Sequence, residues 1–454
     1  MRMASGGFRD DLGPSARAPG GLLRILGVGF GLAVIVGSTL GIGILRTPGL
    51  VAGQLASRSS VLAVWLLGGL YTLLGAVCLT ELGTMLPEAG GYYVYARRAF
   101  GQRAGFAVGW TDWLTYCAVL GYVSIGIGEF SAMLVPALAP ATKLVAIAVL
   151  LFFAALQWAG VRISSRFQEV TTAVKFLAFL ALVVACFAYA APPPAGGGDP
   201  SAASPPASTL VGIVIALQAV AITYGGWQSA LYFTEEDRDP RRNLPRATIG
   251  GVLSVLVIYL LVNAALLSVL PLPVLARSTL PAADAARVIF GGHGGQLITL
   301  LSLVSLPPLV NAIMMIGTRI LFAMGRDGLV WQQTAAVNAR GTPAVATLVT
   351  TGVAVALVVT GTFQNLIAVT SFFLAANYCA CCLALVVLRR REPQLERPFR
   401  AWGYPWSAAV VLAGAVAFLI GVLLGDTRTA LLAIGLLAVG LLGSRFLSRT
   451  TPLR

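Results

Sequence analysis

Two long hydrophobic segments of this chain are each interrupted near the middle by closely spaced glycines. The first interruption reads Gly41-Ile42-Gly43, and the second is the pair Gly225-Gly226. Glycine destabilises a helix interior by about 1 kcal/mol relative to alanine, so both segments are predicted to unwind at these points. Unwound backbone cannot face lipid, because its N–H and C=O groups would lack hydrogen-bond partners. The pattern is typical of discontinuous membrane helices that surround a solute site.

The composition indicates an all-α polytopic membrane protein. Of the 454 residues, 57% are hydrophobic and 11% are charged, whereas a soluble domain carries about 25% charged residues. A membrane span needs about 20 apolar residues. Windows of that length predict twelve spans, at about 25–53, 61–86, 104–135, 143–159, 166–190, 209–234, 247–271, 294–325, 343–361, 364–388, 406–424 and 429–447.

The net charge of +14 reports membrane topology rather than nucleic-acid binding. With the N-terminus placed in the cytoplasm, 24 of the 31 basic residues fall in the two tails and the cytoplasmic loops, as the positive-inside rule requires. The other basic residues are Arg58, Lys143, Arg277, Arg287 and Arg428 outside, and Arg46 and Lys175 within spans.

The sequence predicts no metal site, no cofactor and no enzymatic activity. All six cysteines fall within predicted spans, and the single histidine, His293, stands alone. Cys379, Cys381 and Cys382 therefore fit small packing residues better than metal ligands. No His/Cys/Asp group has the spacing of a catalytic or metal site. The polar start of the chain also predicts no cleaved signal peptide.

A low-complexity segment, 191–208, divides the predicted spans into a first group of five and the remainder. Because five is odd, the sixth span enters from the opposite side, and the two groups would be inverted repeats. The predicted organisation is a cytoplasmic tail (1–24), a first repeat (25–190), an extracytoplasmic Pro/Gly/Ala/Ser-rich loop (191–208), a second repeat (209–388), a basic cytoplasmic loop (389–405), two further spans (406–447) and a cytoplasmic tail (448–454).

Five motifs, in order along the chain, resemble those of the amino acid–polyamine–organocation superfamily of permeases, close to its bacterial amino-acid permeases and the L-type transporters. They are Gly41-Ile42-Gly43-Ile44 with Arg46-Thr47-Pro48-Gly49, Glu81 to Gly91, Tyr224-Gly225-Gly226-Trp227 with Thr234-Glu235-Glu236 and Asn243 to Ala247, Arg319 with Ala323 to Gly328, and Arg397-Pro398-Phe399-Arg400 with Gly403-Tyr404-Pro405. The resemblance implies the LeuT-type fold of five plus five inverted helices and amino-acid transport by alternating access. It also implies a bacterial inner membrane location.

The resemblance, together with the glycine breaks, implies a binding site for an α-amino acid. Free N–H groups after the first break would bind the carboxylate, and free C=O groups at the second would bind the ammonium. The family usually has serine at position 42, and Ser38 could replace the hydroxyl that Ile42 lacks. Alternatively, the glycines only allow close helix packing. The expected substrate-binding residues are Ser38, Gly41, Ile42, Gly43, Ile44, Ile222, Thr223, Tyr224, Gly225, Gly226 and Trp227.

Lys175 lies in the middle of a hydrophobic span, where a charge costs about 3 kcal/mol or more. In sodium-independent relatives the matching lysine takes the place of a sodium ion and ties the fifth helix to the unwound part of the first. Lys175 could act as such a fixed charge, carry a coupling proton, or extend to a membrane interface. The acids Glu81, Glu235 and Glu236 are expected to form salt bridges near cytoplasmic helix ends. Asp112 and Glu129 could cap helices or pair near helix ends, or they could form a cation path.

The predicted function is sodium-independent transport of neutral L-amino acids, by proton symport or exchange. The alternatives are a carrier of polyamines or cationic amino acids, and a sensor that does not transport. The expected partners are the amino acid, membrane lipid and, for symport, protons. The stretch 136–143 contains no cysteine, so we expect no disulfide-linked heavy chain.

Overall fold

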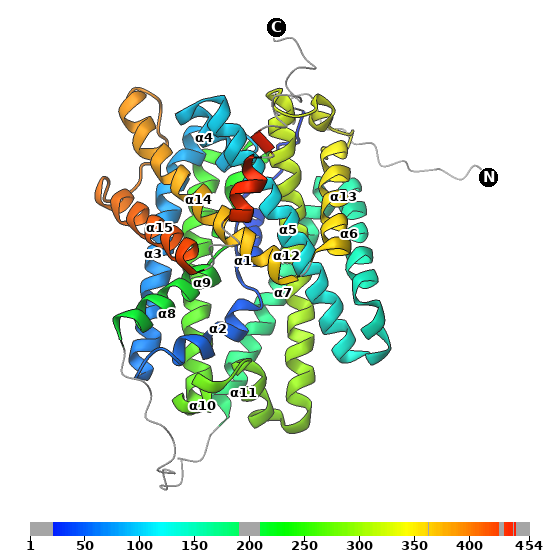
Figure 1. The fold of residues 1–454 in the computed structure, drawn as a ribbon, viewed down its shortest axis with the longest axis vertical. Helices are drawn as coiled ribbons and strands as arrows, with labels where there is room; N and C mark the ends of the chain where they lie inside the picture. The colour runs from blue at the N-terminus through cyan, green and yellow to red at the C-terminus, as the bar shows by residue number, and fades with distance from the viewer. Residues whose placement is uncertain (1–20, 190–208, 362, 426–430, 439, 442–454) are drawn as a thin grey trace, which may run out of the picture.

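The computed structural model describes residues 21–189, 209–361, 363–425, 431–438 and 440–441. These residues form helices joined by loops, and no β-strand occurs among them. Figure 1 shows α4 (Tyr92–Phe100) at one end of the molecule and α10 (Leu272–Arg277) with α11 (Pro281–Phe290) at the other. We call these the α4 end and the α10 end.

Most of the described helices are long and apolar enough to cross a membrane. Nine helical segments meet that criterion in the described parts of the chain, or ten with one bent pair. This confirms a polytopic all-α membrane protein, while twelve spans and two inverted repeats stay predictions. The segments that meet the criterion are formed wholly or mainly by α3 (Arg58–Met85), α5 (Gln102–Leu134), α6 (Thr142–Trp158), α7 (Val161–Ala188), α9 (Pro240–Val269), α12 (Gly294–Arg326), α14 (Phe363–Arg391) and α15 (Trp406–Gly425), and the ninth is Leu210–Glu236. The apolar helix α13 (Ala344–Thr360) is shorter.

Several predicted segments lie outside the described residues. These are most of the N-terminal tail, the whole loop 191–208, about half of the last predicted span (429–447) and the C-terminal tail 448–454.

Both predicted helix breaks are present. The first segment is divided into α1 (Val28–Thr39) and α2 (Gly43–Ala52), whose axes differ in direction by 50°. The second is divided into α8 (Leu210–Thr223) and the 3-10 helix η3 (Trp227–Glu236). In Figure 1, α1 and α2 follow one another through the middle of the molecule, and α8 lies beside α2.

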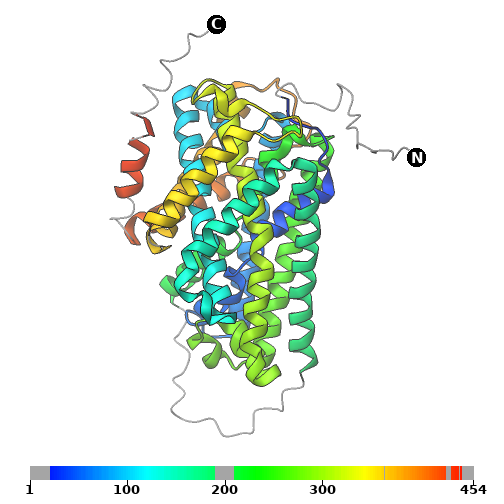
Figure 2. The same ribbon diagram turned by 90° about the vertical axis from the view of Figure 1, so that its right-hand side faces the viewer.

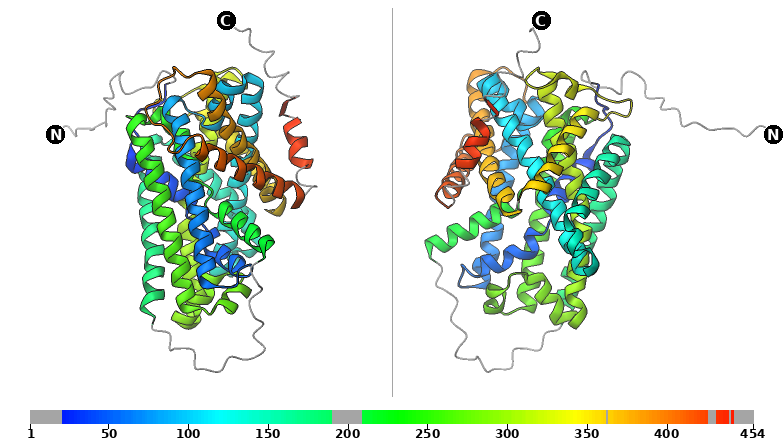
Figure 3. Two further views of the ribbon diagram at one scale, coloured as in Figure 1. Left: turned by 90° about the vertical axis from the view of Figure 1, so that its left-hand side faces the viewer. Right: turned by 45° about the vertical axis from the view of Figure 1, so that its right-hand side comes forward.

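The helices differ greatly in how much of their apolar surface is covered by protein. In the most apolar part of each span, 67% of α5 is buried, against 17% for α6 with its preceding turn and 22% for α15. Figure 2 shows α6 and α13 on one outer face, and Figure 3 shows α15 at another edge. Thus α5 lies at the centre, while α6 and α15 present apolar side chains to the surroundings.

Candidate binding site at the two helix breaks

At the first break the chain leaves one helix and starts another within a few residues. The N–H of Leu40 donates to the carbonyl of Val36 at 2.9 Å, which completes α1. Ile42 caps α2 with helical angles (φ −64°, ψ −25°), and Gly43 is its first residue. The N–H groups of a first helical turn have no partner within the helix, so α2 begins with backbone donors available to a ligand.

The second break depends on a glycine in a left-handed conformation. The N–H of Tyr224 donates to Val220 at 3.0 Å and ends α8, and Gly225 N–H then donates to Ile222 at 3.0 Å. Gly226 has φ +118°, which residues with a Cβ rarely adopt. This glycine turns the chain into η3 and leaves carbonyl groups at the end of α8.

The two breaks lie directly against each other. A Cβ atom placed on Gly226 would lie 2.7 Å from the backbone of Ser38, and one on Gly43 would lie 3.1 Å from Thr223 Cγ2. The Ser38 hydroxyl lies 3.0 Å from the Gly226 carbonyl and 2.7 Å from the hydroxyl of Ser229. The hydroxyls of Thr47 and Thr223 are 2.8 Å apart. The structure therefore unites segments 188 residues apart in sequence into one backbone cluster.

Tyr259 of α9 joins the two breaks, and sequence reasoning missed it. Its hydroxyl lies 2.7 Å from the carbonyl of Thr39, at the end of α1, and 3.0 Å from that of Thr223, at the end of α8. Its ring packs against those of Trp65 and Tyr224 at 5.4 Å and 4.9 Å. A lone tyrosine in an apolar span gives no sequence signal for this role, because most such residues only pack.

Lys175 ends inside the protein rather than at an interface. The side chain is fully buried, and its ammonium donates to the carbonyl of Gly37 at 2.8 Å. That carbonyl belongs to the last turn of α1, whose C=O groups lack partners within the helix. Lys175 therefore connects α7 to the last turn of α1, next to the unwound segment to which the family resemblance assigns it, and its role in coupling stays a prediction.

The remaining predicted residues differ in what their side chains can do. Ile44 and Tyr224 point into the core, so only their backbone groups are available to a ligand. Trp227 is buried against the ring of Tyr378 at 5.9 Å, which favours packing over a role in lining a pocket. Ile222 is 58% exposed, and Gly43 is also exposed.

The carbonyl groups of the second break keep some capacity for a ligand. That of Ile222 accepts from Gly225, and that of Thr223 accepts from Tyr259. Each carbonyl oxygen has two lone pairs, so each can accept a second hydrogen bond.

Ion pairs hold η3 and the neighbouring loops at the α4 end, as predicted for the three glutamates. Arg319 forms a bidentate pair with Glu236 at 2.7 and 3.1 Å, and both side chains are fully buried. Glu235 pairs with Arg326 at 2.8 Å. Glu81, also fully buried, pairs with Arg389 and Arg397 and so connects α3 to the end of α14 and to the loop after it.

Asp112 also anchors η3. Its carboxyl is fully buried in α5 and accepts a hydrogen bond of 2.7 Å from the hydroxyl of Tyr232. The contact joins α5 to the half-helix that follows the second break. It favours the pairing role over the cation path for Asp112.

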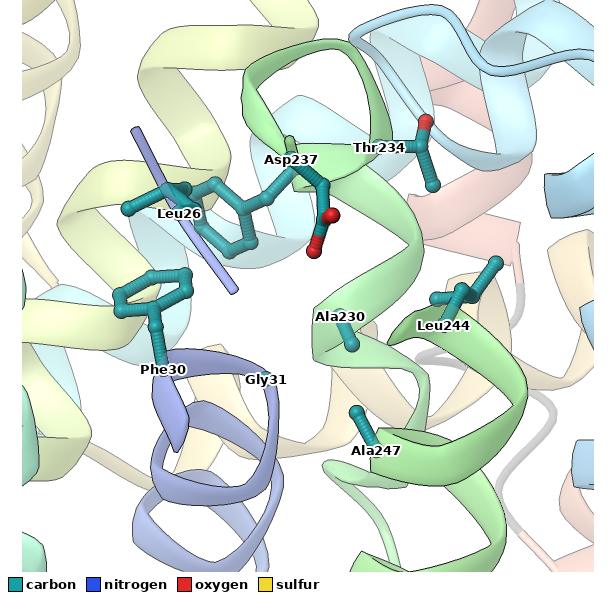
Figure 4. Close-up of a pocket in the computed structure, with 9 residues that line it drawn as sticks. Leu26, Phe30, Gly31, Ala230, Thr234, Asp237, Leu244 and Ala247 are labelled. Atoms are coloured by element: carbon teal, nitrogen blue, oxygen red, sulfur yellow. The ribbon is translucent and has the colours of Figure 1, made fainter. Parts of the chain in front are cut away.

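Figure 4 shows a cavity at the α4 end that is distinct from the predicted site. It lies between α1, η3 and α9, has a volume of about 10 Å³ and is lined mainly by apolar side chains such as Leu26, Phe30 and Leu244. That space holds about one water molecule. None of the residues predicted to bind the amino acid lines it.

The described residues contain no group of three or more His, Cys, Asp or Glu side chains placed to hold a metal ion. All six cysteines are buried as free thiols.

The chain resembles known transporters over most of its length. A family model described as amino acid permease matches residues 31–439. The serine/threonine exchanger SteT of Bacillus subtilis (strain 168) is 27% identical, with 93% of this chain and 96% of the relative covered. The mouse b(0,+)-type amino acid transporter 1 is 28% identical over 84% of this chain and 79% of its own. The human large neutral amino acids transporter small subunit 2 is 28% identical, over 87% of this chain and 76% of its own. Because the family match spans most of the sequence, the chain belongs to the amino acid permease family.

Proposed function

We propose that this protein is a sodium-independent transporter of neutral L-amino acids that works by alternating access, as a proton symporter or an exchanger. The observation that carries the proposal is the contact between the two helix breaks. It brings the first N–H groups of α2 close to the last C=O groups of α8, as the separation of the Thr47 and Thr223 hydroxyls, 2.8 Å, illustrates. Relatives named as a serine/threonine exchanger and as amino acid transporters support the same substrate class.

The backbone itself supplies both complements of an α-amino acid. The N–H groups of Ile42, Gly43 and Ile44 bind the carboxylate at the positive end of the α2 dipole, and the carbonyls of Ile222, Thr223 and Gly225 bind the ammonium. Each helix-end interaction contributes roughly 0.3–2 kcal/mol. A few of them together suffice for millimolar affinity, which corresponds to about −4 kcal/mol. Such a site binds its substrate weakly enough to release it.

Lys175 supports independence from sodium. Its ammonium places one fixed positive charge 2.8 Å from the Gly37 carbonyl, beside the first break. In sodium-coupled relatives, to which the sequence resemblance extends, a sodium ion takes the matching place. A covalently held charge removes the need for that ion, and it leaves open whether a proton moves with the substrate.

Topology and partners complete the proposal. We infer that the α4 end faces the cytoplasm of a bacterium, because the basic loops lie there. We also infer that the spans of 25–190 and those of 209–388 form two inverted repeats. We infer that the protein works without a disulfide-linked heavy chain, although one relative is named as a small subunit.

Counterflow in sodium-free proteoliposomes tests the proposed function. Vesicles are loaded with each unlabelled amino acid in turn, and uptake of a labelled amino-acid panel is measured with and without a pH gradient. We expect accumulation with a preference for neutral side chains. No accumulation of any amino acid by folded, inserted protein would contradict the proposal and favour a sensor. Uptake of polyamines instead would favour the polyamine carrier.

A further inference from the structure

The short helix after the first break has one exposed face that carries a charge. Gly43, Arg46 and Leu50 are exposed, while Ile44 and Leu45 between them are fully buried. Residues three or four positions apart lie on the same side of a helix. We call Gly43, Arg46 and Leu50 the exposed face of α2.

Arg46 is close to the start of α2 and has no ionic partner. At a rise of 1.5 Å per residue, it lies about 4.5 Å along the helix axis from Gly43. In the part of the chain that the structure describes, no ion pair or hydrogen bond involves its guanidinium, whereas Arg319 and Arg326 of α12 each pair with a glutamate. Arg46 therefore presents an uncompensated positive charge one turn from the first break.

The depth of Arg46 in the span limits what this face can contact. α2 begins at a break in the middle of a hydrophobic segment, and a charge at that depth is costly in lipid. Charged side chains in membrane helices therefore face the protein interior or a water-filled cavity. The side chain is exposed, so it is not covered by protein. Water is the remaining environment, and the same face carries Gly43, which the substrate must reach.

We propose that Arg46 is a specificity-determining residue that excludes amino acids with cationic side chains and favours neutral and acidic ones. The inference rests on the proposed function, because it concerns the route to that same site. A substrate whose α-carboxylate binds at Gly43 lies about one helical turn from Arg46, so we take about 8 Å as the separation between a charge on its side chain and the guanidinium. Two unit charges at this separation change a dissociation constant about twofold in bulk water and about thirtyfold at an effective dielectric constant of 20.

The test compares two replacements of Arg46 with a matched control. Inhibition constants of lysine, serine and glutamate against labelled substrate are measured for the wild type, Arg46→Gln and Arg46→Lys. The control is Arg58→Gln, which removes an exposed arginine at the start of α3, outside the breaks. We expect Arg46→Gln to improve the relative affinity for lysine and weaken that for glutamate, each by about 2- to 30-fold. Arg46→Lys and Arg58→Gln should keep the order of the three inhibition constants seen in the wild type.

Two further measurements cover the case in which Arg46→Gln does not fold. Raising the salt concentration should weaken the discrimination of the wild type, because salt screens charges in contact with water. Arg46→Cys should react with a membrane-impermeant thiol reagent and be protected by substrate, over a low background because the native cysteines are buried. Unchanged selectivity in Arg46→Gln, or a cysteine that substrate does not protect, would overturn the inference. If the wild type transports amino acids in these assays, the proposed function stands even when the inference fails.

Discussion

The two halves of each broken helix are held in the protein very differently. The halves toward the α4 end, α1 and η3, are buried and carry specific polar contacts. The halves toward the α10 end, α2 and α8, are partly exposed and carry few such contacts. The difference teaches that each break separates a fixed half from a half that can move, and it assigns the movable halves to one end of the molecule.

Polar side chains from several helices fix the buried halves. All ten residues of η3 are buried, and Arg319, Arg326 and Asp112 hold its acids and a tyrosine. In α1, Lys175 binds the carbonyl of Gly37 at 2.8 Å, and Thr172 binds that of Ala33 at 3.0 Å. These contacts lie in low-dielectric surroundings, where a polar group that loses its hydrogen-bond partner destabilises the fold.

The exposed halves rely mainly on apolar packing and on each other. Leu210 and Val211, at the start of α8, are 79% and 67% exposed. A side-chain hydrogen bond between Thr47 of α2 and Thr223 of α8, 2.8 Å long, joins the two halves. Moving α2 and α8 away from the rest of the protein would therefore separate apolar surfaces but break few ion pairs or side-chain hydrogen bonds, which fits the moving part that the proposed alternating-access mechanism requires.

The largest effect is expected from breaking the buried pair that fixes η3. Glu236→Gln leaves Arg319 as an uncompensated buried charge, which should lower the free energy of unfolding by about 3–5 kcal/mol. The control is Glu396→Gln, which breaks a pair with Arg241 in which both side chains are more than half exposed. That pair should contribute less than about 1 kcal/mol. Thermal or denaturant unfolding in detergent measures the stability of both variants. An equal loss of stability in the two would contradict the view that buried ion pairs fix η3.

The second largest effect, on transport, is expected from removing the hydrogen bond by which Lys175 holds α1. Lys175→Ala leaves the Gly37 carbonyl without its partner and removes the charge beside the break, so we expect initial uptake to fall more than about tenfold. Lys143→Ala is the matched control, because the sequence contains two lysines and Lys143 is exposed. Wild-type uptake by Lys175→Ala across the pH range would remove this lysine from the mechanism.

A substitution at the start of α2 should weaken substrate binding with a smaller effect on the fold. In Gly43→Val, the first added carbon already lies 3.1 Å from Thr223, and the branched side chain covers the backbone N–H groups of the helix start. We expect an affinity loss of about tenfold, or about 1.4 kcal/mol. Binding is measured by scintillation proximity, with Gly352→Val on the exposed side of α13 as control. Unchanged affinity would mean that this break serves packing alone.

The smallest effect is expected from removing the hydrogen bond between Thr47 and Thr223, which joins α2 and α8. Thr47→Val removes its hydrogen bond to Thr223, which contributes about 1 kcal/mol, equivalent to about a fivefold change in an equilibrium. The distance between labels on α2 and α8, measured by spin-label spectroscopy, should shift toward the separated population by that factor. Thr360→Val, which affects a hydroxyl bonded within its own helix, should leave the distribution unchanged. A loss of folding in Thr47→Val would show that α2 is held as firmly as η3.

The sequence predicts the parts of this architecture that depend on local chemistry. The breaks could be located because glycines at 41, 43, 225 and 226 destabilise a helix wherever they occur. The burial of Lys175 followed from the cost of a charge in lipid. The bridge made by Tyr259 could not be predicted, because it depends on three helices meeting at one hydroxyl. Likewise, Asp112 gave no sign of its partner, since Tyr232 is 120 residues away in the sequence.

The geometry of Tyr259 has a consequence for how the two broken helices move together. A phenol carries one hydrogen, yet its oxygen lies within bonding distance of two carbonyls, at 2.7 and 3.0 Å. At any instant it can satisfy fully only one of them. The two helix ends thus compete for a shared proton donor. When either one withdraws, the other gains an undivided bond, so the departure of one half-helix strengthens the hold on its neighbour.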